Sequence, residues 1–309
     1  MKQKQIMNIL ARDVRSFLIS EGIQIESLQE IRLRVGQPMI LFYKGRERVQ
    51  SLIVRENMIR ETLDYVSNYS LYAYENEMRQ GFITVEGGHR VGMAGQVILE
   101  NGCVKNLKQI SSLNIRISHE VLNCASVLFP YITHQNRLYH TMLISPPRCG
   151  KTTLLRDLIR QISNGNQWIF GCSVGVVDER SELAGCYHGV PQNHMGMRTD
   201  VLDGCPKDVG MLMLIRSMAP EVVAVDELGT SGDIQAVKFA MHCGAKMLVT
   251  VHGESFAEIQ KKPLFEQMVK EQYFERFVVL KNGRHIGEIA GIYDAQGRIL
   301  YKEDAICIN

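Results

Sequence analysis

The strongest chemical signal in the chain is the segment from Ser145 to Thr152, which reads Ser-Pro-Pro-Arg-Cys-Gly-Lys-Thr. It lies between an apolar strand predicted for 138–144 and a helix predicted for 152–163, as a phosphate-binding loop requires. In such a loop backbone N–H groups point at the β-phosphate, Lys151 bridges β and γ oxygens, and the Thr152 hydroxyl coordinates Mg²⁺. The sequence therefore predicts a site for a nucleotide and Mg²⁺ rather than a chance loop. The residues predicted to bind the nucleotide are Ser145, Pro146, Pro147, Arg148, Cys149, Gly150, Lys151, Thr152, Thr153 and Asp226.

One position departs from the usual pattern, because Ser145 stands where the first glycine of such a loop is expected. Its β-carbon either distorts the phosphate cradle or is tolerated there. Gly150, Lys151 and Thr152 are all present at the right spacing, so the nucleotide site remains the prediction.

A second signal is an apolar strand at 222–225 that ends in Asp226 and Glu227. The carboxyl end of a parallel strand faces the crevice where ligands bind. There Asp226 is predicted to hold Mg²⁺ through water, and Glu227 is predicted to polarise the water that attacks the γ-phosphate. An acidic pair after a strand is often only a helix cap, and it gains meaning here from the phosphate loop.

Two more apolar strands end in polar residues. Val176 and Val177 lead into a run that contains Glu179, and the strand at 248–251 leads into His252. Successive strands of one sheet could bring these groups to the same rim, so Glu179 and His252 are predicted to be catalytic. The alternatives are a surface turn for Glu179 and a helix cap for His252.

The elements of the second half position these groups. Apolar strands alternate there with helical patterns, which indicates an α/β fold with a parallel sheet covered by helices. A tail with turns at Asn282-Gly283 and Gln296-Gly297 predicts an antiparallel ribbon. The predicted elements are 138–144, 152–163, 168–177, 207–218, 222–225, 231–242 and 246–251, with ribbon strands at 277–280, 286–293 and 299–301.

The first half lacks this alternation and predicts a smaller α+β domain over 1–130. Residues 130–136 are predicted to be a linker, followed by a second domain over 137–309 that carries the phosphate loop. Gly87, Gly88 and Gly92 partly mimic a dinucleotide fingerprint, but strands on both sides favour turns. The predicted elements of this half are strands at 30–35, 39–43, 82–85, 90–99 and 104–107, and one or two helices within 56–80.

Residues 1–21 repeat apolar side chains at helical spacing and predict one amphipathic helix packed on its own domain. No signal peptide is expected, and no stretch approaches the 18 apolar residues of a membrane span. The 35 basic and 33 acidic residues leave a net charge of +2, which argues against nucleic acid as a partner. Eight widely spaced cysteines are typical of reduced thiols in a cytoplasmic protein.

The order of these marks resembles the secretion-ATPase branch of the RecA-like P-loop ATPases and, more narrowly, the stage III sporulation AA family. The residues that carry the resemblance are the stretches 86–95, 112–117, 150–157, 177–182, 198–207 and 213–218.

The resemblance implies a RecA-like ATPase of the mother cell in endospore-forming bacteria, which assembles as a ring, a hexamer in the expected case. It implies a peripheral location at the membrane facing the forespore. A membrane-anchored channel protein of the same operon is the implied partner, and energising channel assembly or transport is the implied task. It also gives Glu179 an acidic-box role and makes His252 a sensor of the γ-phosphate.

The family tends to have arginine at the position of Thr230. This chain therefore lacks one cation at that position. Ring ATPases of this type place subunit interfaces at the nucleotide, so the resemblance implies an arginine supplied by a neighbouring subunit. Two other readings stay open: a nucleic-acid-dependent ATPase, and a scaffold that binds ATP with little hydrolysis. The candidate arginine fingers are Arg90, Arg116, Arg198 and Arg216.

Overall fold

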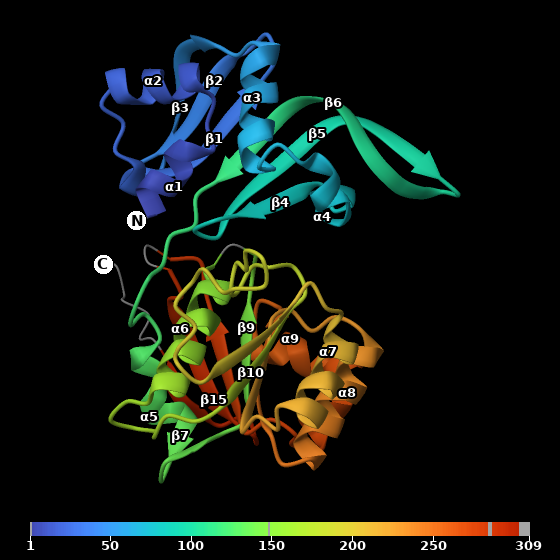
Figure 1. Ribbon diagram of the computed structural model, residues 1–309. Coiled ribbons are helices and arrows are strands. Elements are labelled where there is room, and N and C mark those ends of the chain that lie inside the picture. The colour runs from blue at the N-terminus through green and yellow to red at the C-terminus, as the bar shows by residue number, and fades with distance from the viewer. Residues whose placement is uncertain (1, 148, 284–285, 303–309) are drawn as a thin grey trace. The chain divides into compact units, whose positions relative to one another are not determined.

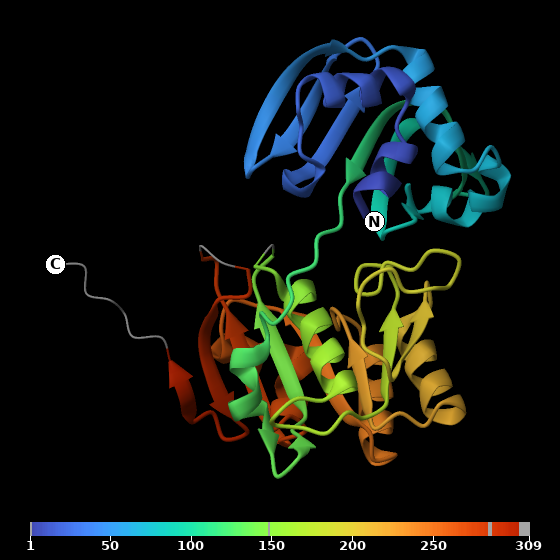
Figure 2. The ribbon, with the colours of Figure 1, turned by 60° about the vertical axis from the view of Figure 1, so that its left-hand side comes forward.

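The computed structural model describes residues 2–147, 149–283 and 286–302, and the chain forms two compact units (Figure 1 and Figure 2). The first unit comprises 1–119 together with 185–192, and the second comprises 120–184 and 193–309. The segment 185–192 belongs to the first unit because Gln192 accepts the Gly87 N–H at 2.9 Å and Tyr187 accepts an amide N–H of Asn68 at 3.1 Å. Each unit has its own sheet.

The first unit contains a six-stranded antiparallel sheet in the order β3-β2-β1-β6-β5-β4. The predicted strands are present, but β6 is much longer than the predicted 104–107, and β3 was not expected. Seven of the eight β3 residues carry charged or polar side chains or are exposed apolar ones, so the strand lacks the alternation that signals a buried face. The strands are β1 (Leu28–Arg34), β2 (Pro38–Tyr43), β3 (Arg46–Ile53), β4 (Phe82–Val85), β5 (His89–Glu100) and β6 (Cys103–Arg116).

Helices pack on this sheet and complete an apolar core. The predicted single N-terminal helix is two helices, because Ala11 has an extended backbone and its N–H donates to Thr62 at 3.1 Å. The expected packing on its own domain is confirmed by the buried side chains of Ile6, Leu10 and Val14. The α-helices are α1 (Lys2–Asn8), α2 (Arg12–Ser20), α3 (Glu56–Val66) and α4 (Glu75–Arg79).

The second unit contains an eight-stranded sheet in the order β11-β10-β12-β13-β9-β14-β15-β16. The pairings from β11 to β14 are parallel, and β15 and β16 continue the sheet antiparallel. The predicted α/β class is confirmed. The strands are β9 (Thr141–Ser145), β10 (Val174–Asp178), β11 (Thr199–Asp203), β12 (Val222–Val225), β13 (Lys246–His252), β14 (Arg276–Leu280), β15 (Ile289–Asp294) and β16 (Ile299–Lys302).

Three details of this sheet differ from the prediction. The segment 168–177 becomes a strand only at Val174, and β11 was not expected. The predicted C-terminal ribbon is not an appendage, because its first strand β14 pairs parallel with β9 and so lies inside the sheet.

Helices cover both faces of the sheet. α7, α8, α9 and α10 share one apolar core with alternate residues of the parallel strands, and α6 contacts β9, β10 and β13. In Figure 1, α6 is separated from α7 and α8 by the strands. The helices are α5 (Phe129–Ile132), α6 (Lys151–Asn164), α7 (Lys207–Ser217), α8 (Ser231–His242), α9 (Phe256–Lys261) and α10 (Pro263–Lys270).

The boundary between the units lies earlier than the predicted linker at 130–136. The backbone N–H groups of Asn123 and Ala125 donate to the Asp157 carboxylate of α6, at 3.0 and 2.9 Å. These bonds tie the chain after Glu120 to the second unit, so residues 120–136 belong to that unit. Within the described residues, no helix is long and apolar enough to cross a membrane.

Candidate active site

The predicted phosphate loop connects β9 to α6. Gly150 caps α6 in a left-handed conformation with φ of +82°. A β-carbon there would overlap the side chain of Ile286, so both backbone and space require glycine. The first N–H groups of α6 lack helical partners, which makes this end a suitable place for phosphate oxygens.

Ser145 is accommodated as the last residue of β9. Its side chain is fully buried, its hydroxyl donates to the Pro146 carbonyl at 2.7 Å, and its own carbonyl accepts the Gly253 N–H at 3.2 Å. The β-carbon that replaces the expected glycine therefore lies inside the strand. Ser145 itself keeps regular strand geometry and pairs with His252 of β13.

The rest of the loop is braced by the segment between β14 and β15. The Gly287 N–H donates to the Cys149 carbonyl at 3.0 Å, and the Cys149 thiol contacts the Asn282 side-chain oxygen at 3.0 Å. Pro147 accepts a weak contact from the same thiol at 3.7 Å. Arg148, also predicted to bind nucleotide, lies outside the described residues.

Lys151, Thr152 and Asp226 lie together. The Thr152 hydroxyl donates to Asp226 Oδ2 at 2.7 Å, and Lys151 Nζ is 3.8 Å from Asp226 Oδ1. The Thr250 hydroxyl also donates to Asp226 Oδ1. Hydroxyl and carboxylate oxygens are the donors that Mg²⁺ prefers, so this pair fits a magnesium ion bound together with a nucleotide. Thr153 lines a separate small cavity beside Arg156.

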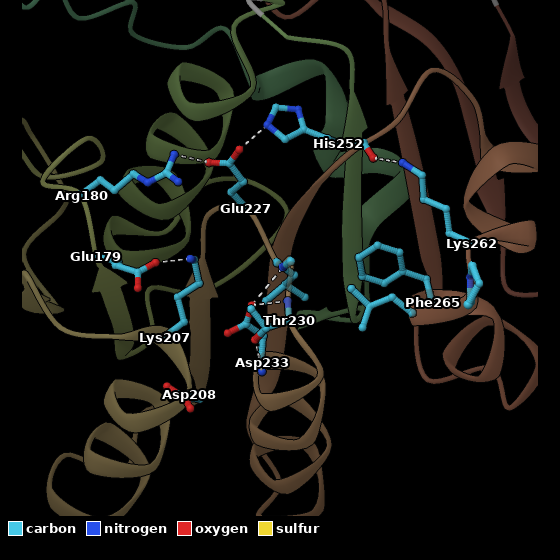
Figure 3. A pocket seen from close by; sticks show the side chains of 14 residues that line it. Glu179, Arg180, Lys207, Asp208, Glu227, Thr230, Asp233, His252, Lys262 and Phe265 are labelled. Atoms are coloured by element: carbon cyan, nitrogen blue, oxygen red, sulfur yellow. Dashed lines mark hydrogen bonds and ion pairs between the residues drawn. The ribbon is translucent and has the colours of Figure 1, made fainter. Parts of the chain in front are cut away.

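Glu227 occupies a strained and electrically crowded position. Its φ is +62°, a conformation that non-glycine residues rarely adopt and that clusters at functional sites. Its N–H donates to the Thr250 hydroxyl at 2.8 Å, which holds the backbone in place. Figure 3 shows its carboxylate between Arg180, whose guanidinium is 3.0 Å away, and the His252 ring.

These neighbours fix the charge of Glu227. Burial by itself raises the pKa of the carboxyl, but Lys151, His252 and Arg180 outweigh burial and hold its pKa below the ordinary value. The carboxylate is therefore anionic at neutral pH and can orient a water molecule or accept its proton.

The acidic segment after β10 is held rigidly. Asp178 accepts the N–H groups of Glu182, Leu183 and Ala184 at 2.8 to 3.0 Å. Burial raises the pKa of Asp178 to about 6, because the three N–H donors offset only part of the desolvation. Glu179, predicted to be catalytic, forms an ion pair with Lys207 at the start of α7.

A cavity of about 730 Å³ adjoins Glu227 and His252 and extends to the start of α10 (Figure 3). Thr230 lies at its wall and caps α8: the Thr230 hydroxyl accepts the Asp233 N–H, and the Asp233 carboxylate accepts the Thr230 N–H at 2.9 Å. The threonine that replaces the expected arginine thus has a structural role as a capping box.

The four candidate arginine fingers have these surroundings. Arg90 stacks on the Phe82 ring at 3.3 Å, and Arg116 is 3.8 Å from Glu30. Arg198 donates to the Ser163 carbonyl at 2.9 Å, at the end of α6 opposite Lys151. Arg216 is exposed on α7.

Two residues at the centre of the site were missed by the sequence analysis. Arg180 lies between Glu179 and Ser181, and its position two residues after the end of β10 is the signal that could have found it. Thr250 lies inside β13, two positions before His252, and only the pairing of β13 with β12 shows that it faces Asp226.

Comparisons with known proteins place the chain in a family. The family described as Sporulation stage III, protein AA, matches residues 1–300. The Stage III sporulation protein AA of Bacillus subtilis (strain 168) is 42% identical over 304 residues, which cover 98% of each chain.

Two solved structures share the fold. The ATPase DotB of Legionella pneumophila has a TM-score of 0.57 at 12% identity, covering 91% of this chain and 80% of that chain. The pilus retraction motor PilT, solved with bound ADP, has a TM-score of 0.59 at 14% identity, covering 94% and 83%. The second unit accordingly has the α/β fold of the P-loop ATPases, with a mostly parallel sheet flanked by helices.

Proposed function

Since the chain belongs to the Sporulation stage III, protein AA, family, we propose that it is an ATP-hydrolysing enzyme that works during endospore formation. The observation that carries this proposal is the contact of Lys151 and Thr152 with Asp226, beside the strained Glu227. This is the arrangement that binding and hydrolysis of Mg²⁺-ATP require.

The residues divide the work as follows. Lys151 and the N-terminus of α6 bind the phosphates, while Thr152 and Asp226 hold the magnesium ion, which supplies charge neutralisation at the γ-phosphate. Glu227 orients a water molecule and accepts its proton. The new bond joins the water oxygen to the γ-phosphorus, and the bond to the β–γ bridging oxygen breaks, so ADP leaves with that electron pair. His252 and Glu179 help to set the position of Glu227 and of the loop beside it.

The finer parts of the proposal follow from the family. The enzyme forms a ring, with a hexamer as the expected size, and one of Arg90, Arg116, Arg198 or Arg216 reaches the nucleotide of a neighbour. It lies at the mother-cell membrane facing the forespore and binds a membrane-anchored sporulation channel protein. There ATP turnover energises assembly of the channel or transport through it.

One observation favours a second function, a scaffold that binds ATP to assemble but hydrolyses it slowly. Each oxygen of the Glu227 carboxylate already has a partner, Arg180 on one and His252 on the other, and these partners compete with an attacking water molecule. A scaffold would form rings equally well with ATP and with a non-hydrolysable analogue. A motor would need turnover for its work at the membrane.

The decisive experiment measures the Mg²⁺-dependent ATPase rate against protein concentration for the native chain and for Lys151→Ala. The native rate should rise with concentration, because ring contacts complete the site, and Lys151→Ala should lower it by about 1,000-fold. Lys270→Ala is the matched control, since Lys270 lies exposed on α10 in a pair with Glu266. A native chain without turnover at any concentration, with or without membranes that carry the channel protein, would refute the enzyme.

A further inference from the structure

Arg180 differs from the other cations around the cavity next to the catalytic centre. Lys207 is committed to Glu179 and its side chain is only 14% exposed, while Lys262 donates to the backbone carbonyl of His252 and is 37% exposed. The side chain of Arg180 is 61% exposed, and its guanidinium meets the protein at the Glu227 carboxylate. Its head can therefore leave Glu227 at a low cost, because an exposed ion pair contributes at most about 1 kcal/mol.

The turn that follows Arg180 is, by contrast, fixed to α6, the helix that begins at the phosphate loop. The guanidinium of Arg156, one turn after Thr152 on α6, donates to the carbonyls of Glu182 and Leu183 at 2.6 Å each. The Asp178 carboxylate holds the same turn through three backbone N–H groups. A fixed backbone and an exposed guanidinium allow the Arg180 side chain to move between two partners.

The second partner lies within reach. A γ-phosphate held by Lys151 and Thr152 would be separated from Glu227 by the attacking water. Two hydrogen-bond lengths through the water separate Glu227 from the phosphate oxygens, and a third joins Glu227 to the guanidinium, so Arg180 lies at most about 9 Å from the phosphate oxygens. Rotation of the Arg180 side chain covers such a distance without any backbone movement.

We propose that Arg180 is a catalytic residue supplied by the same chain, which moves from Glu227 to the γ-phosphate when a nucleoside triphosphate binds. The move has two effects. Glu227 is released to orient the water, and the guanidinium neutralises the charge that develops on the phosphate oxygens. A diphosphate offers no γ-oxygens, so Arg180 then stays on Glu227. This inference rests on the proposed ATPase function.

The first test is binding. Fluorescent ADP and a fluorescent non-hydrolysable ATP analogue are titrated into the native protein, Arg180→Ala and the control Arg60→Ala, whose guanidinium pairs with Glu56 on an exposed face of α3. Arg180→Ala should weaken the triphosphate analogue by about 10-fold or more and leave ADP unchanged, since only the triphosphate gains the charged hydrogen bonds. Arg60→Ala should match the native protein.

The second test is turnover. Arg180→Ala should lower kcat by about 1,000-fold, as loss of a transition-state arginine does, and added guanidinium should restore part of the rate beyond an equal concentration of sodium chloride. An unchanged ratio of triphosphate to diphosphate affinity would overturn the inference, as would a rate that rises when Arg180 is removed. A native protein that binds neither nucleotide would instead refute the proposed function itself.

Discussion

The amino-terminal and carboxyl-terminal ends of the parallel strands form two opposite sides of the eight-stranded sheet, the amino edge and the carboxyl edge. Both edges carry buried or half-buried ionisable groups, yet these groups are bonded differently. At the amino ends, His140 precedes β9, Lys246 begins β13 and Glu275 precedes β14, three neighbouring strands. At the carboxyl ends stand Asp226 and Glu227 after β12, with the partners described above.

The amino-edge groups bond mainly to backbone. The His140 N–H donates to Glu275 Oε2 at 2.8 Å, the His140 ring accepts the Met247 N–H at 3.1 Å, and the His140 carbonyl accepts the N–H groups of Glu275 and Arg276. Lys246 adds an ion pair to Glu275 at 3.0 Å. Together these bonds hold the starts of three strands in register, which is a structural role.

The carboxyl-edge groups bond mainly to one another through side chains. Thr152, Thr250 and Asp226 form one chain of contacts, and Arg180, Glu227 and His252 form the next. The backbone of Glu227 has a positive φ, whereas His140, Lys246 and Glu275 do not. The number of charged groups therefore does not distinguish a catalytic site from a structural cluster. The carboxyl edge is distinguished because its side chains bond to other side chains and because the backbone of Glu227 is strained.

The largest expected effect comes from Glu227→Gln. The amide keeps the size of the side chain but cannot accept a proton, so turnover should fall by about 100- to 10,000-fold. The measurement is the initial rate of ADP formation at saturating ATP. Nucleotide binding should persist, because Lys151 and Thr152 are untouched.

Glu275→Gln, which removes a carboxylate from the amino edge, is the matched comparison. Turnover that survives Glu227→Gln would remove the assigned base and with it the functional meaning given to the carboxyl edge.

Most of the carboxyl edge was predictable from the sequence because it is written in short local signals. Gly150, Lys151 and Thr152 fix the loop by spacing, and apolar strands that end in Asp226 and in His252 mark the rim. Their contacts in space depend on which strands are neighbours. The insertion of β13 between β12 and β9, which brings His252 to Glu227, is a non-local fact of topology.

Two strands and the boundary between the units were not predicted correctly from the sequence, for identifiable physical reasons. β3 and β11 are strands without a buried face or a continuous apolar run, so periodicity does not reveal them. The unit boundary at Glu120 depends on hydrogen bonds from Asn123 and Ala125 to Asp157, which lies more than thirty residues away. Such side-chain to backbone bonds leave no pattern in composition.

The next effect concerns pH. Because burial raises the pKa of Asp178 from 3.8 to about 6, the native state takes up its proton first as pH falls. The contribution of Asp178 to the free energy of unfolding thus increases as pH falls from about 6 to about 4, by about 3 kcal/mol, and is lost as pH rises again. Asp178→Asn should abolish this slope, in addition to a constant loss from one unpaired N–H.

The slope is best read as the difference between native protein and Asp178→Asn in urea unfolding at a series of pH values. The amino edge titrates with the opposite sign: burial lowers the pKa of His140 from 6.5 to about 4, so its contribution falls as pH drops from about 6.5 to about 4. The two opposing groups mask each other in the native protein alone. A difference that does not change with pH would show that Asp178 is charged throughout.

The smallest effect is expected from Glu275→Gln. The amide oxygen can still accept the His140 N–H, but the charge that pairs with Lys246 is lost from side chains about one-third exposed. The free energy of unfolding should fall by about 1 kcal/mol or less, seen as a lower urea midpoint at constant slope. Glu266→Gln, which breaks an exposed pair on α10, is the control. Turnover should stay within about two-fold of native, because sites that share no partners act independently. If turnover fell by more than the change in unfolding free energy explains, the amino edge would position the catalytic groups through β9 and β13. The distinction between a structural amino edge and a catalytic carboxyl edge would then fail.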